Sequence, residues 1–127
     1  MFSDLLGVKW LKGGRDLKGL DCYGLAMIAK KRLEGIDLPE YSTPDDDATF
    51  VNMILKEVDI AEKIEVPVSG CFVLFAVGGP YKLHIGVMVD NDKFIHILRN
   101  NTVSIERISH PFWKSKVKGL YKWNNRQ

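Results

Sequence analysis

The sequence predicts an α+β fold, in which helices come first along the chain and an antiparallel sheet follows. Apolar residues recur at helical spacing between residues 21 and 58. From Val66 onward the pattern becomes extended, with short β-branched and aromatic runs separated by Gly, Asp and Asn. Because the two patterns occupy separate parts of the chain, we expect the helices to pack on one face of a roughly five-stranded antiparallel sheet.

Length and composition predict a single domain over residues 1–127. The chain has 127 residues, of which 46% are hydrophobic, enough for one buried core and too few for two ordinary domains. Its formal charge of +2 comes from 18 basic and 16 acidic residues without a long run of one sign. We therefore expect no nucleic-acid partner.

A first helix is expected directly after a glycine-rich loop, "KGGRDLKG", at residues 12–19. Asp21 is a good N-cap, because its carboxylate accepts hydrogen bonds from amides one turn into a helix. The helical pattern then continues until Gly35 and Pro39 stop it. This assignment places Cys22 at the first position of the helix.

A second helix is expected to start at Thr43 as the cap, with Pro44 in the first turn. The acidic triplet at 45–47 follows, where the helix dipole favours anions, so we interpret it as a helix start and not as a metal site. The apolar residues expected to be buried on this helix are Phe50, Val51, Ile54, Leu55 and Val58.

Five extended runs are expected to form the sheet as a meander. They read "CFVLFAV", "HIGVMV", "KFIHIL", "TVSIERI" and "VKGLYKW", and turn residues separate them. No internal repeat or low-complexity segment interrupts them.

The turn between the second and third runs decides where the two histidines lie. If Val89 pairs with Lys93 across a loop of Asp90 to Asp92, then His84 and His96 share one face of the sheet. A two-residue loop sends them to opposite faces, and the sequence allows either register. A shared site requires the three-residue loop. In that case we expect both histidines on the helix-facing side, and on the other side Ile85, Val87, Ile95 and Ile97.

Cys22, His84 and His96 are the candidates for thiol chemistry. A thiolate is the reactive form of cysteine, and the first turn of a helix together with an imidazole favours it. His84 is the expected base and His96 the group that orients it. Asp21 opposes a thiolate unless capping occupies its carboxylate. The backbone amide of Cys22 is a candidate oxyanion donor.

Two other interpretations remain open at this level. Buried cysteines and histidines are often only core residues. A zinc site made of Cys22, Cys71, His84 and His96 is also conceivable, although these residues lack the paired spacing that zinc sites usually show. Spacing alone does not decide between them.

Three stretches in this order, "GGRDLKGLDCYGLAMIAKKRLEGIDLP", "SGCFVLF" and "HIGVMVDNDKFIHI", resemble the NlpC-type (NlpC and p-sixty) cysteine peptidases of bacterial cell walls. The later "HPFWKSK" also resembles a closing segment of that family, so the resemblance covers about residues 7–123. It implies a papain-like NlpC-type fold with Cys22 as nucleophile, His84 as base and His96 as third member. It implies no metal and no cofactor.

The chain departs from the family pattern at three positions. Trp10 stands where the family usually has a Tyr near the oxyanion site, and an indole N–H donates but does not accept. Tyr23 follows the nucleophile where many members have Ser, and Cys71 replaces a common acidic residue and is most simply a core residue. The candidates for oxyanion or substrate binding are thus Trp10, Asp21, Tyr23 and Arg15. Arg15, together with Lys12 and Lys18 in the same loop, is a candidate to bind substrate carboxylates.

The resemblance implies hydrolysis of peptidoglycan stem peptides, typically at the amide between D-γ-glutamate and a diamino acid. "GGRDLKGLDCYGL" looks most like the bacteriophage tail branch of the family, whose partners are other tail proteins. The start "MFSDLLGVKW" has no signal-peptide pattern and no run is long enough to span a membrane, so we expect synthesis in the bacterial cytoplasm and delivery on a virion tail. The alternative is a structural tail-tip protein that keeps the fold with little activity.

Overall fold

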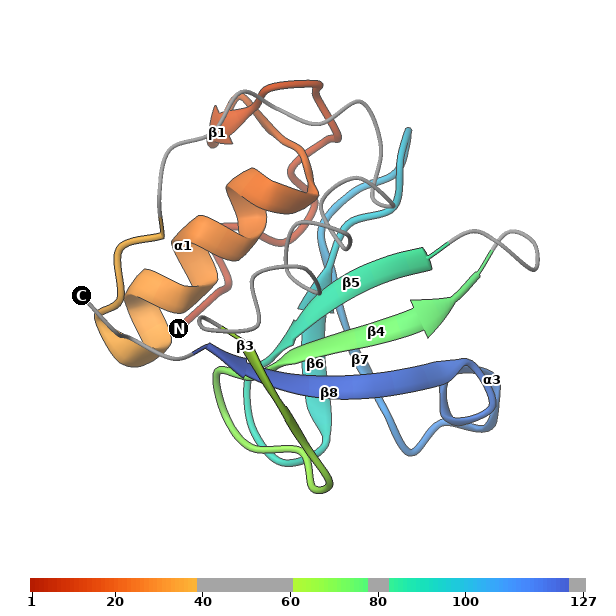
Figure 1. The fold of residues 1–127 in the computed structure, drawn as a ribbon. Helices are drawn as coiled ribbons and strands as arrows, with labels where there is room; N and C mark the ends of the chain where they lie inside the picture. Colours follow the sequence, from red (N-terminus) through yellow and green to blue (C-terminus); the bar gives the residue numbers. More distant parts are fainter. Residues whose placement is uncertain (39–60, 78–82, 124–127) are drawn as a thin grey trace.

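The computed structural model describes residues 1–38, 61–77 and 83–123. In this part of the chain a helix, α1, lies along one side of a six-stranded antiparallel sheet (Figure 1). The α+β class is therefore confirmed. The helix expected from Thr43 lies outside the described residues, and none of the described helices is long and apolar enough to span a membrane.

The glycine-rich segment before α1 is a small hairpin rather than the expected loop. β1 (Arg15–Asp16) pairs antiparallel with β2 (Gly19–Leu20), and the carboxylate of Asp16 accepts a hydrogen bond from the amide of Lys18 across the turn at 2.9 Å. Two-residue strands are too short to show the alternation that predicts a strand, so the sequence pattern missed them.

Helix α1 spans Cys22–Glu34, as expected from its capping residues. Asp21 caps its start, and Gly35 ends it in the left-handed conformation with a φ of 67°. The buried ammonium of Lys30 joins the helix to the turn before the strand that starts at Phe72, because it donates to the carbonyl of Gly70 at 2.8 Å and also pairs with the carboxylate of Glu34 on the helix.

The sheet has the strand order β3-β8-β4-β5-β6-β7. Five of these strands match the expected runs: β4 (Phe72–Ala76), β5 (Leu83–Met88), β6 (Lys93–His96), β7 (Ser104–Arg107) and β8 (Val117–Trp123). The sixth, β3 (Ala61–Ile64), was not expected. The meander is correct for β4 to β7, but β8 lies between β3 and β4 instead of beside β7. A short helix, α3 (Pro111–Lys114), lies in the connection that returns the chain to that position.

Each face of the sheet carries its own apolar cluster, because side chains alternate along every strand. The face that packs against α1, which we call the aliphatic face, has these buried residues on its strands: Phe72, Leu74, Ile85, Val87, Ile95 and Trp123. Ile97, directly after β6, belongs to the same cluster. The opposite face, which we call the aromatic face, contains Cys71, Val73, Phe75, Met88, Phe94, Trp113 and Leu120.

The turn between β5 and β6 has the register that a shared histidine site requires. Val87 pairs with Ile95, and the amide of Val89 donates to the carbonyl of Lys93 at 2.8 Å, which leaves a three-residue loop. The carboxylate of Asp90 selects this loop, since it accepts from the amides of Asp92 at 2.8 Å and of Lys93 at 2.7 Å. These backbone hydrogen bonds also hold the pKa of Asp90 below its usual value.

The expected choice of face, however, was wrong. His84 and His96 share a face, but it is the aromatic one, whereas Ile85 and Ile95 point toward α1. The physical reason is that α1 covers strand positions that carry apolar side chains, while the ring nitrogens need hydrogen bonds, which the two histidines find in each other on the opposite face.

Candidate active site

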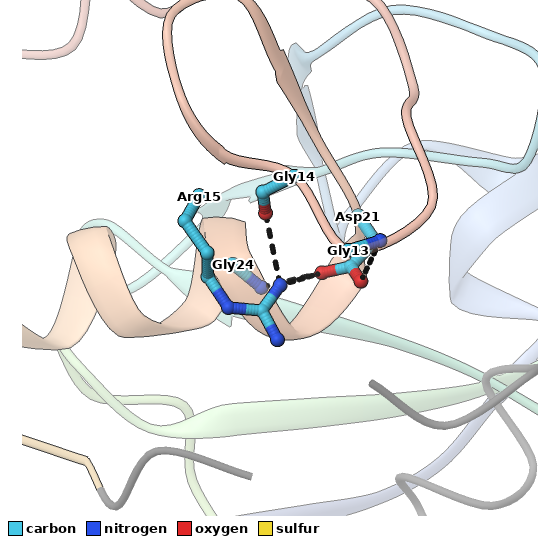
Figure 2. A network of polar contacts seen from close by, with 5 residues as sticks. All are labelled: Gly13, Gly14, Arg15, Asp21 and Gly24. Carbon is cyan, nitrogen blue, oxygen red and sulfur yellow. Dashed lines mark hydrogen bonds and ion pairs between the residues drawn. The ribbon is translucent and has the colours of Figure 1, made fainter. Parts of the chain in front are cut away.

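A network of polar contacts holds the chain just before α1 (Figure 2). The buried carboxylate of Asp21 accepts from the amide of Gly24 at 2.7 Å and from the amide of Gly13 at 3.0 Å. It also accepts from the guanidinium of Arg15 at 2.8 Å. The capping that the sequence required of this carboxylate is therefore present, and a cation balances its charge.

Arg15 is engaged in this network instead of pointing into solvent. Besides Asp21, its guanidinium donates to the carbonyl of Gly14 at 2.9 Å and lies 5.6 Å from the ring centre of Tyr23. Tyr23 is almost completely buried. These contacts give both residues a structural role in placing the start of α1, whereas Lys12 and Lys18 are exposed.

The glycines around this network allow two stretches of backbone to touch. A Cβ on Gly24 would lie 2.1 Å from the carbonyl oxygen of Gly14, and a Cβ on Gly14 would lie 2.2 Å from the carbonyl oxygen of Gly19. No side chain fits in either place. The glycine two residues after Cys22 is thus explained by close packing of the hairpin on the helix.

Cys22 occupies the first position of α1, as the sequence predicted. It is half-buried, packs against the aliphatic-face core and forms no disulfide. The amides of a helix's first turn carry a partial positive charge, which favours an anion at this position. The pairing of Asp21 with Arg15 removes the main local charge that would oppose a thiolate there.

The second cysteine lies in a different environment. Cys71 is fully buried in the apolar cluster of the aromatic face, which agrees with its expected role as a core residue. Burial raises the pKa of the Cys71 thiol. It therefore has less thiolate character than an ordinary cysteine.

His84 and His96 contact each other directly, with Nε2 of His84 2.8 Å from Nδ1 of His96. Both are buried, and aromatic rings surround them. Phe75 stacks on His84 with ring centres 6.1 Å apart, and Trp113 packs edge-on to His96 at 4.9 Å. The aromatic rings restrict both imidazoles to one orientation. Within His84 the contact with His96 engages Nε2.

Glu106 was missed by the sequence analysis. Its Oε2 lies 2.5 Å from Nε2 of His96, while the hydroxyl of Ser104 lies 3.2 Å from the same nitrogen. Burial opposes ionisation of Glu106, but hydrogen bonds from Trp113 and His96 hold the pKa of its carboxyl below the ordinary value. No spacing in the sequence singles out Glu106, because it reaches His96 only through the pairing of β6 with β7, in which Ser104 lies opposite His96.

Trp10 contacts both the segment before α1 and the segment that follows His96. It bridges to Leu20, just before the capping segment, and its amide donates to the carbonyl of Asn101 at 2.9 Å. The guanidinium of Arg99, three residues after His96, lies 5.1 Å from the Trp10 ring. These contacts fix Trp10 beside the segment that leads into α1, and its oxyanion role stays a prediction.

No group of three or more His, Cys, Asp or Glu side chains in residues 1–38, 61–77 and 83–123 has an arrangement suited to a metal ion. The nitrogens of the two histidines that face each other form a hydrogen bond instead of converging on a common point.

Comparison with known proteins identifies the family of the chain. Residues 7–122 match the model of the NlpC/P60 family. The chain is 25% identical to the murein DD-endopeptidase MepS/murein LD-carboxypeptidase of Escherichia coli K12, over 91% of this chain and 55% of the relative. It is 28% identical to the gamma-DL-glutamyl hydrolase of Bacillus subtilis 168, over 94% of this chain and 27% of the relative.

A solved structure supports the fold. The crystal structure of an NlpC/P60 family protein from Bacillus cereus ATCC 10987 superposes with a TM-score of 0.64 at 19% identity, covering 94% of this chain and 36% of that chain. The chain spans about half the length of the E. coli relative and about a quarter of the B. subtilis one. It corresponds to one part of these longer proteins.

The packing of the hairpin on α1 gives a stability prediction. Gly24→Ala should lower the free energy of unfolding by about 2–3 kcal/mol, because the added methyl overlaps the carbonyl of Gly14. Helix propensity alone would give a gain of up to about 1 kcal/mol. Urea denaturation measures the difference. As a control, Gly35→Ala meets open space and should lose only about 1–2 kcal/mol through its left-handed backbone. A Gly24→Ala variant as stable as the parent would contradict the close packing.

Proposed function

Because the chain belongs to the NlpC/P60 family, we propose that it is a thiol hydrolase that cuts amide bonds in peptidoglycan stem peptides. The observation that carries the proposal is the contact between Nε2 of His84 and Nδ1 of His96. It orients His84 as a base whose second nitrogen, Nδ1, serves a thiol. Cys22, at the start of the helix that packs against β5, is the thiol that we assign to it.

In the proposed mechanism His84 Nδ1 takes the proton of Cys22, and the helix start stabilises the resulting thiolate. The thiolate attacks the carbonyl carbon of the amide, so a C–S bond forms while the C–N bond breaks. The imidazolium of His84 gives its proton to the leaving amine. His84 then takes a proton from a water molecule, whose oxygen attacks the carbonyl carbon of the thioester. A C–O bond forms, the C–S bond breaks, the acid is released, and the leaving thiolate of Cys22 receives the proton back from His84. His96 keeps the His84 ring in place through both steps.

The tetrahedral intermediates of both steps need hydrogen-bond donors for their oxyanion. We assign one donor to the backbone amide of Cys22. The indole N–H of Trp10 is the second candidate, because Trp10 bridges to Leu20 immediately before the capping residue.

For the bond, we propose the amide between D-γ-glutamate and the diamino acid. The name of the B. subtilis relative, a gamma-DL-glutamyl hydrolase, supports a γ-glutamyl linkage. The name of the E. coli relative describes a DD-endopeptidase and an LD-carboxypeptidase, so those linkages are the alternatives that a product analysis must separate.

We further propose that the protein acts as a part of a bacteriophage tail and reaches the cell wall from outside. The support is the likeness of "GGRDLKGLDCYGL" to tail-associated members of the family.

The reactivity of the two cysteines tests the assignment of the nucleophile. At pH about 6, Cys22 should be alkylated by iodoacetamide far faster than Cys71, because the helix start and His84 favour its thiolate while burial raises the pKa of Cys71. Peptide mass spectrometry after timed quenching measures both rates. The Cys71→Ser variant should label like the parent, and His84→Ala should slow the labelling of Cys22. Faster labelling of Cys71 would remove the basis of the mechanism.

The reaction itself is tested with purified muropeptides under reducing conditions. The parent protein should release the fragments expected from γ-glutamyl cleavage, whereas Cys22→Ala should retain none of this turnover. Mass spectrometry of the products identifies the bond, and Cys71→Ser serves as the matched control that keeps activity. Turnover by Cys22→Ala equal to the parent would disprove the mechanism, and no cleavage by the parent would leave the structural tail-tip protein as the better assignment.

The tail association predicts that phage particles contain the protein. Virions purified on a density gradient from a host that produces the protein should carry it, and mass spectrometry should find its peptides in proportion to known tail proteins. An abundant cellular protein from the same lysate, absent from the purified particles, is the control. Particles without the protein would contradict the tail role and leave the peptidase proposal standing.

A further inference from the structure

We propose that Glu106 is a positioning residue of the active site, which fixes the protonation of both imidazoles and stabilises the positive charge on them. This inference rests on the proposed function for its kinetic consequences, but its structural part is independent of activity. It adds a fourth side chain to the cysteine and the two histidines that the sequence singled out.

The first step of the argument concerns His96. An ionised carboxylate only accepts hydrogen bonds, so the contact of 2.5 Å between Glu106 Oε2 and His96 Nε2 requires a proton on Nε2. In a neutral imidazole the other nitrogen, Nδ1, then carries no proton and acts as an acceptor. The Ser104 hydroxyl, at 3.2 Å from the same Nε2, is a weaker and neutral neighbour that does not impose this choice.

The second step carries the choice to His84. Because Nδ1 of His96 accepts, Nε2 of His84 at 2.8 Å must donate. The proton of a neutral His84 is thus on Nε2. Its Nδ1 carries no proton and can accept the proton of a thiol. One carboxylate thereby sets the tautomers of two rings in series. Without it both rings can also adopt the other tautomer, in which Nδ1 of His84, the nitrogen that must act as the base, carries the proton.

The surroundings of Glu106 suit this role. Its side chain is 40% exposed, while the side chain of His96 is 2% exposed, so the carboxylate lies at the rim of the buried pair and not inside it. The groups that face the carboxylate are His96 on β6, the indole of Trp113 on α3 and the imidazole of His110 at the cap of α3. Each of these groups favours the ionised form of Glu106, either by donating a hydrogen bond to it or by carrying a positive charge near it.

The charge matters when the thiolate forms. Proton transfer from Cys22 leaves one positive charge on the imidazole pair, and the carboxylate of Glu106 attracts it. Loss of this negative charge should make the thiol harder to ionise and the imidazolium easier to deprotonate. The window of pH in which the thiolate–imidazolium pair exists should therefore narrow from both sides.

The first test is spectroscopic and does not need turnover. In the Cys22→Ala protein, ¹⁵N-correlated NMR of the histidine rings above their pKa values should show His84 protonated on Nε2 and bare on Nδ1. Glu106→Gln should reduce the population of this tautomer. The side-chain amide of a glutamine can also donate to an unprotonated Nε2 of His96, and it therefore permits the other tautomer of both rings. A His84 protonated on Nδ1 in the Cys22→Ala protein, or an unchanged tautomer in its Glu106→Gln derivative, would overturn the inference.

The second test is kinetic. Glu106→Gln should lower kcat/KM by about 10- to 100-fold, a part of the ~100- to 10,000-fold that a positioned base supplies. The pH range in which the variant is active should also narrow, because its acidic limit moves to higher pH and its basic limit moves to lower pH. Glu106→Asp, which keeps the carboxylate, should restore part of the rate. The matched control is Glu62→Gln on β3, the strand at the opposite edge of the sheet, which should keep the rate and the profile of the parent.

A double-mutant cycle shows whether Glu106 acts through His96. In a His96→Ala background, Glu106→Gln should have no further effect on kcat/KM, because the connection to His84 is already lost. Equal effects in both backgrounds, or a loss of rate without any change in the pH profile, would assign Glu106 a merely structural role. If the parent protein cuts no muropeptide, the proposed function fails, and the NMR measurement still decides the role of Glu106.

Discussion

The register of the β5–β6 hairpin is the constraint on which the candidate site depends. A shift of one residue inverts every side chain of a strand, so the contact between His84 and His96 exists only with the three-residue loop. The carboxylate of Asp90 stabilises that loop through two backbone amides, and Asp92 fixes its other side through Arg107 at 2.9 Å. Short polar contacts in an exposed turn therefore determine the geometry of a buried imidazole pair.

A second set of contacts places the helix that carries Cys22. Asp21 caps the helix, Arg15 balances the charge of that cap, and the glycines at 14 and 24 let the hairpin and the helix touch. None of these residues needs to contact a substrate to matter for chemistry. They determine where the helix starts and keep a buried carboxylate from opposing a thiolate beside it.

The features that could be predicted from the sequence are those that leave a local pattern. The cap at Asp21, the stop at Gly35 and the alternation in β4 to β8 are local, and each was confirmed. The position of β8 between β3 and β4 could not be predicted, because strand order depends on the long connection through α3 and not on any one strand. The face of the histidines was wrong for a related reason: alternation says which residues share a face, but only packing against α1 decides which face that is.

Glu106 shows where sequence reasoning about sites reaches its limit. A single glutamate on an edge strand has no distinguishing spacing, and its proximity to His96 follows only from the pairing of β6 with β7. Once that pairing is known, hydrogen-bonding rules determine the protonation of the rings. The carboxylate of Glu106 accepts, so Nε2 of His96 donates to it. Nδ1 of His96 then accepts, and Nε2 of His84 donates. The aromatic face makes this possible, because Phe75, Phe94 and Trp113 pack against the two rings and leave them in direct contact with each other. Nε2 of His84 then pairs with Nδ1 of His96, and Nε2 of His96 pairs with the carboxylate at the rim.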